Sequence, residues 1–338
     1  MKKRLRILVL THPDLVPPEE AGILSPREAF EVKTEYDVVS TLREIGHDVH
    51  VLGVQWELRP IRDAVDALKP DIVFNLLEEF HGETVYDQNV VAHLELMKVP
   101  YTGCNPRGLM LSRGKALSKK LLAYHRIRVP DFAVFPMRRK VRRPRHLAFP
   151  LIVKSLIEHS SLGISQASVV DSDEKLIERV HFIHERIGTD AIAEQFIEGR
   201  ELYVSVLGDD RLVAFTPWEL IVEKSQPNEP LIATAKMKHD LDYQTKKGIV
   251  IRAAREVHPG AEERLLHDSK RIYRILELTG YARIDFRLDA DGRTYFLEAN
   301  PNPDIARQEE FAQAAAFDGI PYPKLLERII RLGLRKQE

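Results

Sequence analysis

Four polar side chains at alternating positions near the C-terminal end of the chain could bind a metal ion and a phosphoryl group. Arg283 and Asp285 lie in the run YARIDFRL, and Glu298 and Asn300 lie in the run RTYFLEAN. The turn DADG separates these runs, so residues 281–300 are predicted to form a β-hairpin. Carboxylate and amide oxygens suit Mg²⁺, and an arginine can stabilise a transferring phosphoryl group. An ordinary charged outer face of a hairpin is the alternative.

The predicted face depends on the length of the turn. If Leu288 lies opposite Arg293, then Arg283 pairs with Glu298, and Asp285 lies diagonal to Glu298. The apolar side chains are then expected to form a core surface on the other face: Ile284, Phe286, Leu288, Tyr295 and Leu297. A turn one residue longer or shorter would invert one strand and remove the arrangement.

Two further segments have features of a nucleotide site. Lys154 ends the apolar run PLIVK, just before the loop HSSLG at residues 159–163, and a buried lysine needs a partner such as a phosphate. The run AIAEQFIEGRE at 191–201 predicts a strand followed by a glycine and carboxylates, which could bind ribose and adenine. An edge-strand lysine beside a surface turn is the alternative for the first segment. Residues 108–115 lack the glycine spacing of a P-loop, and no Rossmann dinucleotide motif follows the first strand.

The first hundred residues alternate apolar strand runs with helix-period stretches, which favours a parallel α/β sheet. Turn-forming residues at 98–108 mark the end of this region. A helix is predicted over 109–125, and a strand–loop–strand pattern follows from residue 149. The sequence therefore predicts three domains, with boundaries at 1–108, 109–204 and 205–338.

Composition narrows the classes of function. Fifty Lys and Arg against fifty-one Asp and Glu give a net charge of −1, so no general attraction to nucleic acid or an anionic membrane is expected. No apolar stretch approaches the roughly 18 residues of a membrane span. The single cysteine, Cys104, cannot form an internal disulfide, which favours a cytoplasmic protein. The basic stretch 137–146 is interpreted as a solvated loop, with a clamp for an anionic substrate as the alternative.

Taken together and in this order, these motifs resemble the ATP-grasp superfamily and, within it, the D-alanine–D-alanine ligase-like branch. The resemblance covers most of the chain, including Gly82-Glu83, Glu95 to Gly103, Lys115, PLIVKS, SSLG, AEQFIEGRE and RIDFRLDADGRTYFLEANPNP. It implies an α/β (α+β), three-lobed ATP-grasp fold. An N-terminal Rossmann-like pre-ATP-grasp domain would precede two lobes that grip ATP between them.

The resemblance also implies roles for individual residues. The expected ATP contacts are Lys115, Lys154, Ser160, Glu194, Gln195, Ile197, Glu201 and Lys236. The expected catalytic residues are Arg283, Lys236 and Ser161, with Lys238 as an alternative to Lys236. Asp285, Glu298 and Asn300 match the family's Mg²⁺ ligands, and Mn²⁺ is an alternative metal.

The implied reaction joins a carboxylate to an amine. A substrate carboxylate attacks the γ-phosphate of ATP, and an amine displaces the resulting acyl phosphate to form an amide. Small amino acids or peptides are the expected substrates. A homodimer is one possible oligomeric state. An ATP-grasp kinase and a non-catalytic nucleotide-binding module are the alternatives.

Both substrate regions depart from the D-alanine-specific pattern. Residues 11–22 lack the family's glycine-rich turn with its acidic residue, and residues 300–310 lack its Pro-Gly turn and Ser-Leu pair. Asp304 stands where a glycine would admit a carboxylate, although Arg307 could receive one. His81 is a candidate substrate contact, with a packed loop histidine as the alternative. A substrate other than D-alanine is therefore expected.

Overall fold

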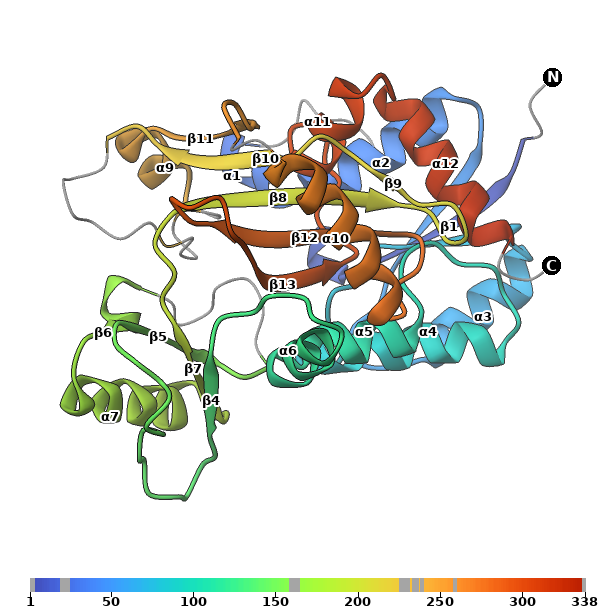
Figure 1. The fold of residues 1–338 in the computed structure, drawn as a ribbon. Helices are drawn as coiled ribbons and strands as arrows, with labels where there is room; N and C mark the ends of the chain where they lie inside the picture. The colour runs from blue at the N-terminus through green and yellow to red at the C-terminus, as the bar shows by residue number, and fades with distance from the viewer. Residues whose placement is uncertain are drawn as a thin grey trace.

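The computed structural model describes residues 4–18, 25–157, 165–224, 232, 237, 240–257 and 260–335. Three β-sheets organise this part of the chain (Figure 1). Within it, no helix is both long and apolar enough to cross a membrane.

The N-terminal sheet is parallel, as the sequence predicted. Its strand order is β2-β1-β3, and β1 pairs in parallel with both neighbours. The strands are β1 (Arg6–Thr11), β2 (Asp48–Gly53) and β3 (Ile72–Asn75). The helices of this region are α1 (Pro26–Glu31), α2 (Lys33–Glu44), α3 (Arg59–Leu68) and α4 (Asp87–Leu96). Since β1 and β3 are almost wholly buried, helices and neighbouring segments cover both faces of the sheet.

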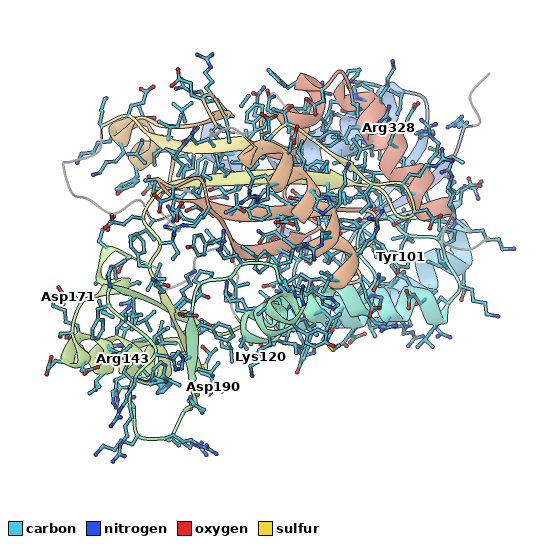
Figure 2. The ribbon with its side chains drawn as sticks, viewed as in Figure 1. Tyr101, Lys120, Arg143, Asp171, Asp190 and Arg328 are labelled. Carbon is cyan, nitrogen blue, oxygen red and sulfur yellow. The ribbon has the colours of Figure 1, made fainter. Side chains whose placement is uncertain are left out.

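The central sheet is antiparallel and has its own small core. Its strand order is β4-β7-β5-β6. The strands are β4 (Phe132–Phe135), β5 (Leu151–Ser155), β6 (Val169–Val170) and β7 (Ala191–Gln195). Helix α7 (Asp173–Phe182), extended by a π-helical turn at Ile183–Ile187, covers one face. Arg143, in the basic stretch, donates to Asp173 of this helix at 2.7 Å (Figure 2).

The C-terminal sheet has six strands in the order β11-β10-β8-β12-β13, with β9 beside β8. The strands are β8 (Arg200–Leu207), β9 (Val213–Ala214), β10 (Trp218–Val222), β11 (Ile249–Ala253), β12 (Tyr281–Leu288) and β13 (Thr294–Pro301). The helices are α9 (Leu241–Lys247), α10 (Ala261–Ile275), α11 (Glu310–Phe317) and α12 (Tyr322–Arg335). Two apolar clusters join residues of this sheet to residues of the N-terminal sheet, so these two regions pack as one body.

Two helices connect the N-terminal sheet to the central sheet. The predicted helix over 109–125 is two helices, α5 (Pro106–Arg113) and α6 (Lys115–Tyr124), because the chain breaks at Gly114. Helix α5 begins at Asn105, whose side chain accepts from the Gly108 amide at 2.9 Å. The predicted domain boundaries stay predictions, but the one at 108–109 lies within α5 and the one at 204–205 lies within β8.

The β12–β13 hairpin corrects the predicted register. Leu288 pairs with Thr294 and not with Arg293, so the loop is one residue longer than expected. This would invert β13, but the register shifts again beyond Asp285, at a β-bulge. Asp285 therefore lies directly opposite Glu298, and the predicted diagonal pairing was wrong. The two one-residue shifts add to two residues, so the polar residues still share one face. The predicted pairing of Arg283 with Glu298 was also wrong, because Arg283 pairs with Asn300.

Between the turn and the bulge, the predicted faces of β13 were wrong. Tyr295 pairs with Arg287 and lies on the polar face, whereas Phe296 pairs with Phe286 and joins the core. Leu297 is the extra residue of the bulge. The bulge thus allows an apolar Phe296 and a polar Glu298 to point to opposite faces although only one residue separates them.

Candidate active site

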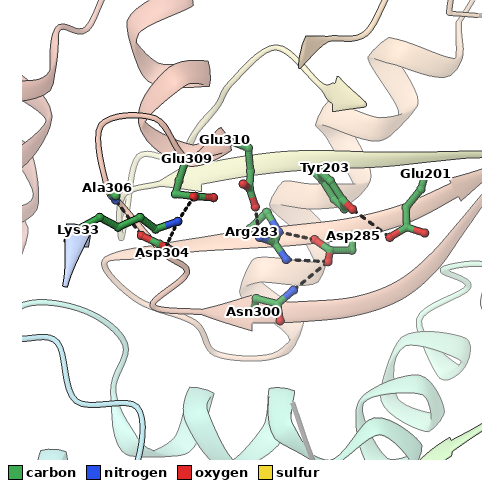
Figure 3. Close-up of polar contacts among 10 residues, drawn as sticks. All are labelled: Lys33, Glu201, Tyr203, Arg283, Asp285, Asn300, Asp304, Ala306, Glu309 and Glu310. Carbon is green, nitrogen blue, oxygen red and sulfur yellow. Dashed lines mark hydrogen bonds and ion pairs between the residues drawn. The ribbon is translucent and has the colours of Figure 1, made fainter. Parts of the chain in front are cut away.

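A buried arginine and a buried carboxylate form the centre of the polar face of the hairpin (Figure 3). Arg283 donates from Nε and Nη2 to the two oxygens of Asp285, at 2.7 and 3.0 Å. Asn300 donates from Nδ2 to Asp285 at 3.0 Å. The Nη1 group of Arg283 pairs with Glu310, and the guanidinium lies 4.9 Å from the ring centroid of Tyr203. These contacts fix the guanidinium plane on this face of the sheet.

The donor set around Asp285 fits a hard divalent cation. Glu298 lies directly across the hairpin from Asp285, and Asn300 contacts Asp285. Two carboxylates and an amide oxygen are too few for a complete shell, and Mg²⁺ commonly fills the rest with water and phosphate oxygens. In the described ranges, no group of three or more His, Cys, Asp or Glu side chains could hold a metal. A metal here would therefore depend on the nucleotide for part of its coordination.

Three lysines converge on one glutamate where α6, β5 and β7 meet, and we call Lys115, Lys119, Lys154 and Glu194 the lysine network. Lys154 donates to Glu194 at 3.2 Å, and Lys119 lies 3.5 Å from its other oxygen. Lys119 is fully buried and also donates to the Leu297 carbonyl at 2.6 Å. The network thereby contacts the bulge residue that precedes Glu298.

Electrostatic interactions connect the lysine network to the hairpin. Burial lowers the pKa of Lys115 to about 8, with Lys154 adding to the shift and Glu298 opposing it. Burial alone would raise the pKa of Glu194, but Lys119 and Lys154 lower it. The pKa of Lys154 is raised because Glu194 and Glu298 outweigh the effect of burial. A site with several cations around few carboxylates suits a polyanion.

Glu201, the predicted ribose contact, is buried on β8. Tyr203 donates to one carboxylate oxygen at 3.0 Å, and Arg287 donates to the other at 2.9 Å. The backbone N–H of Gln195, at the end of β7, donates to the Asp131 carbonyl at 2.7 Å. Ile197 is half-buried between β7 and β8.

A second group of charges lies between α2 and the segment that follows β13. Lys33 pairs with Asp304 at 3.5 Å and with Glu309 (Figure 3). The Thr34 hydroxyl donates to Asp304 at 2.6 Å. Burial and the neighbouring Asp304 raise the pKa of Glu309 to about 7, although Lys33 opposes this shift. We call Glu35, Asp304 and Glu309 the carboxylate cluster.

Glu35 is the most buried member of the carboxylate cluster. Burial raises the pKa of Glu35 to about 7, and Asp304 adds to this shift. The Thr11 hydroxyl donates to Glu35 at 3.3 Å and opposes the shift. A carboxyl group with this pKa is partly protonated near neutral pH.

The two predicted substrate residues contact other side chains of the protein. Arg307 donates to Thr41 at 2.6 Å and lies 3.6 Å from both Asp37 and Glu44, so it joins its loop to α2. His81 is exposed and stacks edge-on against Trp56, with 5.0 Å between ring centroids. Their substrate roles stay predictions. Ser160, Ser161, Lys236 and the alternative Lys238 lie outside the described residues.

Sequence reasoning missed several side chains that hold the predicted ones. They are Lys119, Tyr203, Arg287 and Glu310. Lys119 lies one helical turn after Lys115, so spacing alone could have indicated it. Glu310 is 27 positions from Arg283 and had no local signal.

Comparisons with known proteins agree with this geometry. Residues 121–331 match the family model "D-ala D-ala ligase C-terminus". The D-alanine–D-alanine ligase of Aquifex aeolicus is 30% identical over 91% of this chain and 97% of its own. The corresponding ligase of Desulfotalea psychrophila is 31% identical over 82% of each chain.

Solved structures share the fold at lower identity. The crystal structure of the Bacillus anthracis D-alanine–D-alanine ligase complexed with ATP has a TM-score of 0.75, 21% identity and 98% coverage of each chain. The VanG D-Ala:D-Ser ligase of Enterococcus faecalis has a TM-score of 0.71 and 19% identity, over 98% of this chain and 100% of its own. The fold is thus that of the ATP-grasp ligases. The chain belongs to the D-alanine–D-alanine ligase family and is an ATP-dependent ligase of that type.

Proposed function

We propose that this protein joins a carboxylate to an amine with ATP, releasing ADP, by way of an acyl phosphate. One observation carries the proposal: the β12–β13 register pairs Asp285 with Glu298 and Arg283 with Asn300, while Glu298 acts electrostatically on Lys115 and Lys154. A cationic region for phosphates and a carboxylate pair for a metal then adjoin one arginine. This combination suits phosphoryl transfer to a carboxylate followed by attack of an amine.

Each residue would act by binding or by orienting. Lys115 and Lys154 would neutralise phosphate oxygens, and Glu201 would accept from the ribose hydroxyls. Asp285, Glu298 and Asn300 would hold Mg²⁺, which supplies charge neutralisation at the phosphates when bound. Arg283 would donate to the substrate carboxylate oxygen as negative charge develops on it. No protein nucleophile is needed.

The substrates proposed are amino acids or peptides other than D-alanine. In the region after the metal ligands, Asp304 bonds Thr34, and Glu309 pairs with Lys33. Carboxylates in these positions would repel the carboxylate of an incoming amino acid. Relatives named for D-alanine ligation match most of the chain, but residues 11–22 and 300–310 depart from the D-alanine-specific pattern. These relatives therefore support the reaction more directly than the substrate.

The test measures ADP release with Mg-ATP and pairs of small acids and amines, including D- and L-amino acids and dipeptides. ADP release that needs both partners, with a new amide detected by mass spectrometry, is the expected result. A phosphorylated product without an amide would contradict the ligase proposal in favour of a kinase. Absence of ADP release with every pair, despite Mg-ATP binding, would contradict the small-substrate proposal.

A further inference from the structure

Arg283 is held by two carboxylates that differ in what else they would bind. Asp285 takes two of its hydrogen bonds, and Glu310 pairs with Nη1. Asp285 is also a proposed metal ligand, so its oxygens would be shared once a metal is present. Glu310 has no such competing role. The pair with Glu310 is therefore the one that can persist through a reaction cycle.

The location of Glu310 suits it to hold the Arg283 guanidinium in one position. It is buried and is the first residue of α11. The next residue, Phe311, packs edge-on against Tyr281 and Phe215, with ring centroids 5.5 and 5.9 Å apart. Since Tyr281 begins β12, the helix that carries Glu310 is packed on the strand that carries Arg283. A movement of α11 relative to β12 would disturb this aromatic contact.

On this basis we infer that Glu310 is a positioning residue, which holds the Arg283 guanidinium toward the reacting carboxylate. The inference rests on the proposed ligase function. A guanidinium carries five N–H donors, and three of them donate to Asp285 and Glu310. Among the described residues, no acceptor pairs with the other two, which could donate to substrate oxygens. Tyr203 stacks on the guanidinium face and restricts its rotation.

A structural role for Glu310 is the competing explanation. An acidic residue in the first turn of α11 interacts favourably with the helix dipole, whatever Arg283 does. The two explanations differ in their readouts. A helix-dipole role affects stability alone, whereas a positioning role lowers kcat and depends on the presence of Arg283.

Glu310→Gln keeps the shape of the side chain and removes its charge. We expect kcat for amide formation to fall by about 10- to 100-fold, because small displacements of a positioned group have effects of this size. The KM for ATP should stay within about threefold. Glu310→Asp should recover part of the loss, because it restores the charge.

Glu219→Gln is the matched control. Glu219 forms a two-bond pair with Arg200, at 2.7 and 2.6 Å, in the same sheet. It lies opposite the core residue Leu202, on the face away from Arg283. This variant should keep wild-type kcat. If Glu310→Gln lowers the melting temperature more than the control while kcat is unchanged, the positioning role is wrong.

A double-mutant cycle supplies the decisive comparison. In an Arg283→Lys background, adding Glu310→Gln should change kcat less than about twofold, because its effect acts through the arginine. An equal fold-loss in both backgrounds would overturn the inference. A wild-type protein that forms no amide with any substrate pair would instead overturn the proposed function, since that result precedes any comparison of variants.

Discussion

The lysine network is rich in cationic side chains, whereas the carboxylate cluster is rich in acidic ones. Three lysines surround Glu194 in the first, whereas the second has Lys33 against three carboxylates. Lys115, Lys154 and Glu194 of the network lie in the motifs that carry the family resemblance, whereas the cluster lies outside those motifs. Binding ATP requires the same cationic side chains whatever the substrate is, whereas the residues that bind the substrate can differ between members of a family. Under the proposed function, this comparison separates a nucleotide-binding region that keeps the family's residues from a substrate region that does not.

The largest expected effect on activity is at Glu298, which interacts electrostatically with Lys115 and Lys154 of the lysine network. Glu298→Gln removes one of the two carboxylates of the proposed metal site, and we expect kcat to fall at least about 10³-fold. ADP release measured over a range of Mg²⁺ and Mn²⁺ concentrations checks this. The folded state should persist, because Glu298 is half-buried on a hairpin whose other face forms the core. Activity near the wild-type level would refute the metal assignment.

The sequence predicted the hairpin and the polar face for a physical reason. Alternation of side chains depends only on local strand geometry, so Arg283 and Asp285 could be placed together without a structure. The longer loop and the β-bulge could not be predicted, because a bulge at Leu297 depends on packing of Phe296 in the core and on Lys119 from a distant helix. The two one-residue shifts add to two residues, so Glu298 and Asn300, beyond the bulge, still lie on the predicted face.

The rest of the site depends on tertiary contacts that carry no local pattern. Lys33 meets Glu309 across more than 270 positions. Arg307 was predicted to bind a substrate carboxylate because a guanidinium can form such a pair. In the structure, its guanidinium donates to Thr41 of α2. Pairings of this kind form only when separate elements pack together, so a motif cannot indicate them.

The carboxylate cluster can be tested by pH. The carboxyl of Glu35 titrates near 4.5 in the unfolded chain and at about 7 in the folded protein. Between these values the folded state binds the extra proton, so this group's contribution to stability falls as pH rises from about 4.5 to about 7. Glu35→Gln should remove this dependence, which corresponds to about 3 kcal/mol. Urea unfolding at about pH 4.5 and pH 8 measures it.

Glu44→Gln is the control for that experiment, since Glu44 is exposed at the end of the same helix. Its pH dependence of unfolding should match that of the wild type. If Glu35→Gln has the wild-type dependence too, Glu35 is not held as a raised-pKa carboxyl. Glu35 would then be ionised at neutral pH.

The lysine network can be tested by removing its most buried cation. Lys119→Met keeps the unbranched side chain up to the position of Cε but loses the hydrogen bond to Leu297 and one partner of Glu194. Because Lys154 still pairs with Glu194, we expect a loss of about 2 kcal/mol in unfolding free energy. Lys120→Met, at the adjacent exposed position labelled in Figure 2, should change stability by less than about 0.5 kcal/mol. Equal effects of the two substitutions would argue against a structural network.

The smallest expected effect concerns Arg307, at the edge of the carboxylate cluster. Its guanidinium is partly exposed, donates to Thr41 and lies near Asp37 and Glu44. Arg307→Ala should therefore cost about 1 kcal/mol of stability, the usual scale for a partly solvated contact. Because the guanidinium is held by α2, the KM for the amine substrate should change less than about twofold. A KM that rises tenfold or more for an amine carrying a carboxylate, with stability unchanged, would show that Arg307 leaves α2 to bind substrate. In that case the carboxylate cluster would admit an anionic amine after all, and the contrast between the two regions would describe only the protein without substrate.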